Sequence, residues 1–117
     1  MEKPFYIKSF RGCREIADIM HRAGFEAKSD EAIIASLVAL AHFLEEQKLT
    51  TKKLLLDGEL RGGKSFELWS SDLTEQGLAV IRAGLGNWEQ KGCPGDDIRP
   101  LERAYKKIRN KQKDVAK

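Results

Sequence analysis

The side chains best suited to metal binding or redox chemistry are few in this sequence. The 117 residues include two histidines, His21 and His42, and two cysteines, Cys13 and Cys93. None of these four lies at the close spacing that zinc ligands or a redox C-x-x-C pair require. We therefore expect reduced thiols, no structural metal and no cofactor.

Patterns that would indicate catalysis are also absent from the sequence. It has no H-E-x-x-H, P-loop or nucleophile-elbow motif. Neighbouring acidic residues such as Glu45 and Glu46 diverge by about 100 degrees on a helix, so they form no acid–base dyad by themselves. His42 falls on a predicted apolar helix and is interpreted as a hydrogen-bonded core histidine. We expect that the protein is not an enzyme, since an enzyme would need a pocket where an imidazole meets a carboxylate or Cys13.

Size and composition indicate one globular domain. The chain is 41% hydrophobic and 33% charged, which is typical of a single domain; we assign it to residues 1–110, with a frayed basic tail over 111–117. The longest apolar stretch, Ala32–Leu44, is shorter than the ~20 residues of a membrane span. The N-terminus has no apolar signal core. We therefore expect a cytoplasmic protein that does not enter a membrane.

Charge is unevenly distributed along the chain. Residues 29–97 have seven Lys or Arg and twelve Asp or Glu, whereas residues 98–117 have eight and two. A basic terminal segment suits nucleic acid, an acidic protein partner or an acidic face of the same fold, and a solvated helix face is the simplest interpretation.

Apolar spacing predicts four helices. The first spans 12–24 and ends where Gly24 can adopt a left-handed conformation. The second spans 30–47 and has so wide an apolar arc that we expect it to be the central, buried helix. The third opens at Asp72 with a capping box to Glu75, and the last follows a Pro-Gly turn and a cap at Asp96 or Asp97. The apolar face of the first helix is predicted to consist of Ile16, Ile19, Met20 and Ala23.

Glycines interrupt the third helix at three positions. Each costs about 1 kcal/mol relative to alanine in a helix interior. Close packing against another element, or an early end of the helix near Gly84, would explain them. The stretch G-L-G-N-W lacks the third glycine and the preceding strand of a dinucleotide-binding fingerprint, so we expect no such site.

The remaining segments predict a small antiparallel hairpin. Alternating apolar residues over 65–70, after Gly62–Gly63, predict a strand whose natural partner is 54–61. Residues 4–10 suit a short strand, which could add a third to the sheet, and residues 49–60 also fit a short helix. The sequence thus predicts an α+β, helix-dominated domain with about four helices and a small antiparallel β-hairpin.

Three short motifs in residues 36–81 have a familiar order. They are L-E-E-x-x-L at Leu44, Glu45, Glu46 and Leu49, a glycine pair at Gly62 and Gly63, and L-T-x-x-G at Leu73, Thr74 and Gly77. In this order they resemble the end of winged-helix repressors of the MarR and PadR kind, in which the glycines form the tip of a two-stranded wing. The resemblance implies a winged-helix-like fold in which Lys52, Lys53, Arg61 and Lys64 approach DNA phosphates. Residues 71–92 are also similar to small bacterial proteins of unassigned function.

Two features oppose DNA binding by such a wing. The helix before the wing, residues 30–47, has no Lys or Arg, whereas a recognition helix needs polar and basic side chains at base edges. The acidic middle segment would also repel phosphates. The best remaining nucleic-acid surface is then the basic C-terminal helix, through Arg103, Lys106, Lys107 and Arg109.

We therefore expect a non-enzymatic binding module that acts through contact with a protein partner, of which an inhibitor or immunity-type protein is one form. Trp69 and Trp88 are candidate anchors because tryptophan is enriched in binding hot spots, although a core position is the alternative for both. Trp69 is predicted on the strand face opposite Phe66 and Leu68. A winged-helix-like nucleic-acid binder is the alternative function, and a homodimer remains open.

Overall fold

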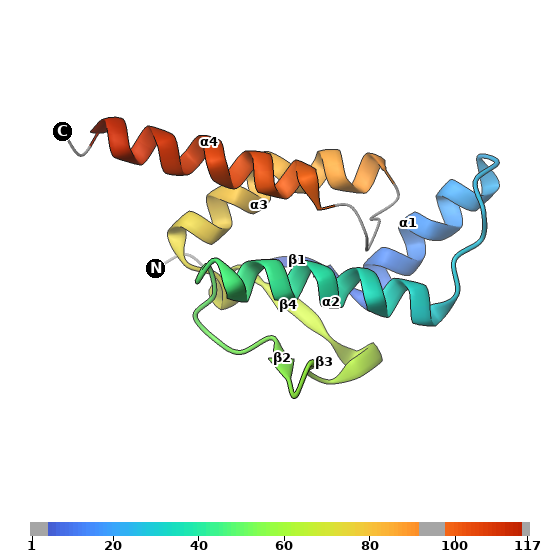
Figure 1. Cartoon of the computed structure of the whole chain (residues 1–117). Coiled ribbons are helices and arrows are strands. Elements are labelled where there is room, and N and C mark those ends of the chain that lie inside the picture. The colour runs from blue at the N-terminus through green and yellow to red at the C-terminus, as the bar shows by residue number, and fades with distance from the viewer. Residues whose placement is uncertain (1–4, 92–97, 116–117) are drawn as a thin grey trace.

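Helices make up most of the structure. The computed structural model describes residues 5–91 and 98–115, the side chains of 111–115 excepted (Figure 1). Within this part of the chain the fold is α+β and helix-dominated with four α-helices, as predicted. The elements in order are β1 (Tyr6–Ser9), α1 (Phe10–Arg22), α2 (Asp30–Glu46), β2 (Leu55–Leu56), β3 (Glu59–Leu60), β4 (Glu67–Trp69), α3 (Glu75–Gln90) and α4 (Arg99–Val115).

The core is built around α2. Ser29 caps this helix, and its hydroxyl accepts a hydrogen bond from the amide of Ala32 at 3.1 Å. The side chains of the α2 stripe are no more than 1% exposed, and burial of each such aliphatic side chain contributes about 1.5–3 kcal/mol. The predicted central, buried helix is therefore confirmed. The stripe consists of Ile33, Leu37, Leu40 and Leu44.

The sheets differ from the predicted hairpin. β4 pairs with β1 in an antiparallel register that places Lys8 opposite Leu68, whereas β2 and β3 form a separate two-stranded hairpin. The expected pairing of 65–70 with 54–61 was therefore wrong. The physical reason is the Asp57–Gly58 pair, which has positive φ angles of 52° and 82° and so turns the chain before it reaches the Gly62–Gly63 pair.

The start of α3 also differs from the prediction. The helix begins at Glu75, because the hydroxyl of Thr74 accepts from the amide of Gly77 at 3.0 Å and so caps the first turn. Asp72 instead ends a short 3-10 turn, where its Oδ2 accepts from the amide of Trp69 at 3.0 Å. The predicted capping box between Asp72 and Glu75 was wrong, because the Asp72 carboxylate accepts from the amide of Trp69, three residues earlier in the chain.

Close packing explains the glycine in the middle of α3. A Cβ atom at Gly84 would lie 2.9 Å from the carbonyl oxygen of Pro100 on α4, and the helix continues to Gln90 without an early end. The backbone of α4 is helical as far as Val115, and the frayed tail over 111–117 stays a prediction. The predicted cap at 96 or 97 lies outside the described residues. In the described part of the chain, no helix has both the length and the apolar character to cross a bilayer.

Candidate interaction groove between α3 and α4

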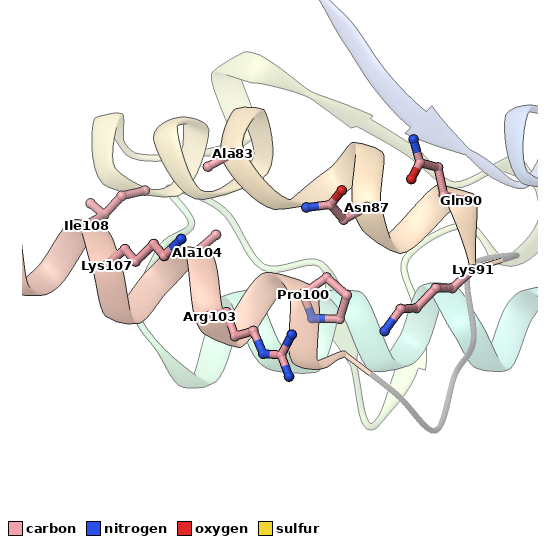
Figure 2. Close-up of a pocket in the computed structure, with 9 residues that line it drawn as sticks. All are labelled: Ala83, Asn87, Gln90, Lys91, Pro100, Arg103, Ala104, Lys107 and Ile108. Carbon is pink, nitrogen blue, oxygen red and sulfur yellow. The ribbon is translucent and has the colours of Figure 1, made fainter.

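The last two helices form an antiparallel pair with a groove along their outer seam (Figure 2). Lys91, the residue that follows α3, lies toward Pro100, and Ala83 lies toward Ile108 at the other end. The groove has a volume of about 530 Å³. Its lining residues recur every three or four positions, so each helix contributes one stripe. They are Ala83, Asn87, Gln90 and Lys91 from the α3 side, and Pro100, Arg103, Ala104, Lys107 and Ile108 from α4.

An apolar floor and a cationic rim make up the groove. Pro100 and Ala104 are buried and Ile108 is half-buried, whereas Arg103 and Lys107 are exposed. None of the nine described residues that line the groove is acidic. With Lys91, the groove therefore has three cations and two neutral amides above apolar atoms. This arrangement can bind a carboxylate or phosphate through charge-assisted hydrogen bonds while apolar groups contact the floor.

The predicted basic residues of α4 divide between two faces. Arg103 and Lys107 line the groove, whereas Lys106 and Arg109 are exposed on α4 outside it. Among the described side chains, none of these four forms a salt bridge. Their positive charge therefore remains available to an anionic partner.

Three of the four predicted wing cations are paired with carboxylates of the same chain. Lys52 Nζ lies 3.9 Å from Asp72 Oδ1, and Arg61 Nη2 lies 3.5 Å from Asp72 Oδ2. Lys64 Nζ donates to Asp30 Oδ2 at 2.9 Å. Asp72 is buried, so the carboxylate that faces Lys52 and Arg61 is fixed in position.

Asp30 joins three elements at the first turn of α2. The hydrogen bond from Lys64 and a second one from Arg14 of α1 hold the pKa of the Asp30 carboxyl below its ordinary value. These hydrogen bonds connect α1, α2 and the segment before β4. Lys64 thus has a role within the fold.

The tip of the β2–β3 hairpin is acidic. Asp57 forms its turn and Glu59 follows on β3, and both are exposed. Lys53 is exposed as well, but these two carboxylates would repel phosphates that approach the tip.

The two tryptophans have different positions. Trp69 is 36% exposed on the face of β4 opposite Phe66 and Leu68, as the alternation predicts. Its Nε1 donates to Glu67 Oε2 at 3.2 Å, and its ring contacts Tyr6 edge-to-face with centroids 5.9 Å apart. Trp88 is fully buried and therefore belongs to the core. Trp69 is the one of the two that is exposed, and it stays a candidate anchor for a protein partner.

The histidines and Cys13 do not converge on one site. His42 has a side chain 68% exposed, with Nδ1 3.5 Å from Glu46 Oε2, so the interpretation as a core histidine was wrong. Position 42 lies off the buried stripe of α2, which is the physical reason. His21 Nδ1 lies 3.1 Å from the carbonyl oxygen of Phe25. The described residues include no group of three or more His, Cys, Asp or Glu that could hold a metal ion, and Cys93 lies outside them.

Three polar residues of the groove were not among the predicted site residues. Asn87 and Gln90 are exposed residues of α3, and Lys91 is the exposed residue that follows the helix. The spacing of four between Asn87 and Lys91 places them on one helix face, but no local pattern shows that α4 packs beside that face.

Comparisons with known proteins add no relative. No family model, curated protein or solved structure matches this chain. The winged-helix resemblance of residues 36–81 stays a prediction.

Proposed function

We propose that this protein is a non-enzymatic binding module whose groove between α3 and α4 binds an acidic segment of a protein partner. One observation carries the proposal: three cations surround an apolar floor, and no carboxylate is among the nine described lining residues. Carboxylates of the partner would accept hydrogen bonds from Arg103 and Lys107. Apolar side chains of the same segment would cover Pro100 and Ala104.

The apolar floor of the groove favours a protein segment as the ligand over the phosphates of a DNA duplex. A phosphate backbone gains its affinity from neutralised charge and released counterions, and it has no apolar group to place against Ile108 or Ala104. An acidic peptide with an apolar residue at every second or third position satisfies both parts of the groove. The internal ion pairs of Lys52, Arg61 and Lys64 further weaken a wing-based alternative.

A matched pair of double variants tests the groove. R103E/K107E reverses two charges that line it, and K106E/R109E reverses two exposed charges on the same helix outside it. The probe is a fluorescein-labelled peptide of alternating glutamate and leucine, with binding measured by fluorescence anisotropy. We expect R103E/K107E to lose at least about tenfold in affinity and K106E/R109E to lose less than about threefold.

The net charge of both variants changes by the same amount, so a general electrostatic effect would weaken them equally. Equal losses would therefore contradict the proposed groove. A second peptide that replaces glutamate by lysine should show no binding, and binding of similar strength would also contradict the proposal.

Nucleic-acid binding through α4 is the second candidate. The observation that favours it is the exposure of Arg103, Lys106, Lys107 and Arg109 on one helix without salt bridges among the described side chains. In that case both double variants would weaken binding to a generic DNA duplex alike. The logarithm of affinity would fall with the logarithm of salt concentration by about 0.9 for each phosphate contacted. Absence of duplex binding at low salt would exclude this function.

A further inference from the structure

The distal half of α1 and the residue just beyond it expose large apolar side chains to solvent. Ile19 is 59% exposed and Phe25, just beyond the helix, is 58% exposed. The apolar face predicted for this helix is therefore only partly covered. Cys13 and Ala17 in the proximal half are buried, whereas Figure 1 shows the distal half leaving the body, with the segment before α2 running back from its end.

Hydrogen bonds close this exposed end of α1. The amide of Gly24, which has a φ of +104°, donates to the carbonyl of His21 at 3.0 Å, and the amide of Phe25 donates to the carbonyl of Met20 at 3.0 Å. These two bonds form a Schellman motif, the glycine closure predicted from the sequence. Ile19 and Phe25 are thus exposed at a helix end whose backbone is closed by hydrogen bonds.

We propose that a second copy of this chain covers the distal half of α1 in a two-fold, antiparallel helix pair. Ile19 lies between Glu15, four residues before it, and Arg22, three residues after it, and all three are exposed along one stripe of the helix. When two such stripes pair antiparallel about Ile19, each Glu15 faces the partner's Arg22. A two-fold axis forms this ion pair twice and places the two Ile19 side chains together.

The charges beside this stripe are compatible with the pairing. Asp18 lies 3.6 Å from Arg14 of its own helix, and Arg14 also pairs with Asp30. Those groups are therefore held within one copy. Arg22 Nε donates to the carbonyl oxygen of Asp18 at 3.4 Å, and its two terminal nitrogens can meet Glu15 across the axis. The surface lies on a different helix from the groove between α3 and α4, so the dimer does not depend on the proposed function.

Sedimentation velocity of the full chain tests whether the dimer exists. The contact involves one helix from each copy and is small, so we expect a reversible dimer with a dissociation constant between about 10 µM and 1 mM. Ile19→Asp should leave only monomer at the same concentrations. The matched control is Leu56→Asp, which changes a residue that is 53% exposed on β2 and should leave the dimer intact. A wild-type chain that stays monomeric at about 1 mM would overturn the proposal, as would equal effects of the two variants.

Charge exchange tests the antiparallel register. Glu15→Arg places two arginines opposite each other at both contacts, so it should raise the dissociation constant by about tenfold. The double variant E15R/R22E restores opposite charges and should return the constant to within about threefold of wild type. Circular dichroism should show the same helix content and melting temperature in all variants, because the changed side chains are exposed. A double variant as weak as E15R would overturn the register and with it the proposal.

Discussion

Replacing Gly84 by alanine tests the helix contact that forms the groove. Alanine gains about 1 kcal/mol over glycine in a helix interior. In the folded protein, however, the new methyl group would lie 2.9 Å from the Pro100 carbonyl oxygen and 3.1 Å from the Ala104 Cβ. The first of these atoms belongs to the backbone, so α4 itself must move. Overpacking of this kind costs about 1–3 kcal/mol, and a mid-range cost of about 2 kcal/mol leaves a net loss of about 1 kcal/mol.

Gly86 on the same helix provides the control. A Cβ at this position would meet nothing within 4 Å, so Gly86→Ala keeps the whole helix-propensity gain and should raise the free energy of unfolding by about 1 kcal/mol. The two alanine variants should therefore differ by about 2 kcal/mol and in sign relative to wild type. Urea denaturation followed by tryptophan fluorescence measures both, because Trp88 is buried in the folded state.

The outcome also bears on the proposed function. If Gly84→Ala stabilises as much as Gly86→Ala, then α3 and α4 are not in contact at this point, and the groove between them has another shape. If Gly84→Ala destabilises as expected, the shift of α4 should also weaken binding of the glutamate–leucine peptide, whereas Gly86→Ala should leave that binding unchanged.

Four other substitutions test the buried charges and the hydrogen bond between Lys64 and Asp30. Asp72→Ala removes a buried carboxylate that accepts a backbone hydrogen bond, and urea denaturation should show a loss of about 1–3 kcal/mol; a loss within error of zero would contradict its structural role. Lys8 is buried, with Nζ 2.9 Å from Glu89 Oε1, so Glu89→Gln leaves an unpaired buried ammonium and should cost more than Lys8→Met, which removes the charge but keeps apolar volume. If Lys8→Met costs more than Glu89→Gln in the same urea denaturation assay, the ion pair between Lys8 and Glu89 itself stabilises the fold. Because the hydrogen bond from Lys64 lowers the Asp30 pKa below 3.8, the stabilisation that it contributes is present above pH 3.8 and is lost as the pH falls through the folded-state pKa. Carbon-13 NMR should show this lowered midpoint, Lys64→Met should raise it, and an unchanged midpoint would refute the role of Lys64.

Local patterns predicted the elements that depend on neighbours in the chain. The apolar arc of α2 and the closing glycine of α1 depend on residues that lie three to five positions apart in the chain. The choice between a strand and a helix at 49–60 had to remain open, because periodicity is too weak over so few residues. The burial of His42 was predicted wrongly for a different reason. The apolar arc of α2 is wide, and the sequence does not show where the edge of that arc lies.

Pairings between distant segments could not be predicted in this way. Whether β4 pairs with β1 or with 54–61 depends on contacts between distant segments, and in the structure the Asp57–Gly58 turn pairs β2 with β3 while β4 pairs with β1. The ion pair of Lys64 with Asp30 joins residues 34 positions apart. Its formation depends on how α1, α2 and the segment before β4 pack together.

The sequence by itself determined the helix-dominated class, the buried α2 and the concentration of positive charge in the last helix, because composition and periodicity act residue by residue. Only the tertiary structure decided which cations of the predicted wing pair with carboxylates and which cations line the groove. Asp72 and Asp30 approach three of the predicted wing cations, whereas α3 brings Lys91 and two amides beside Arg103 and Lys107. The physical reason is that electrostatic and packing energies depend on distance in space, and the fold sets those distances between segments that are far apart in the chain.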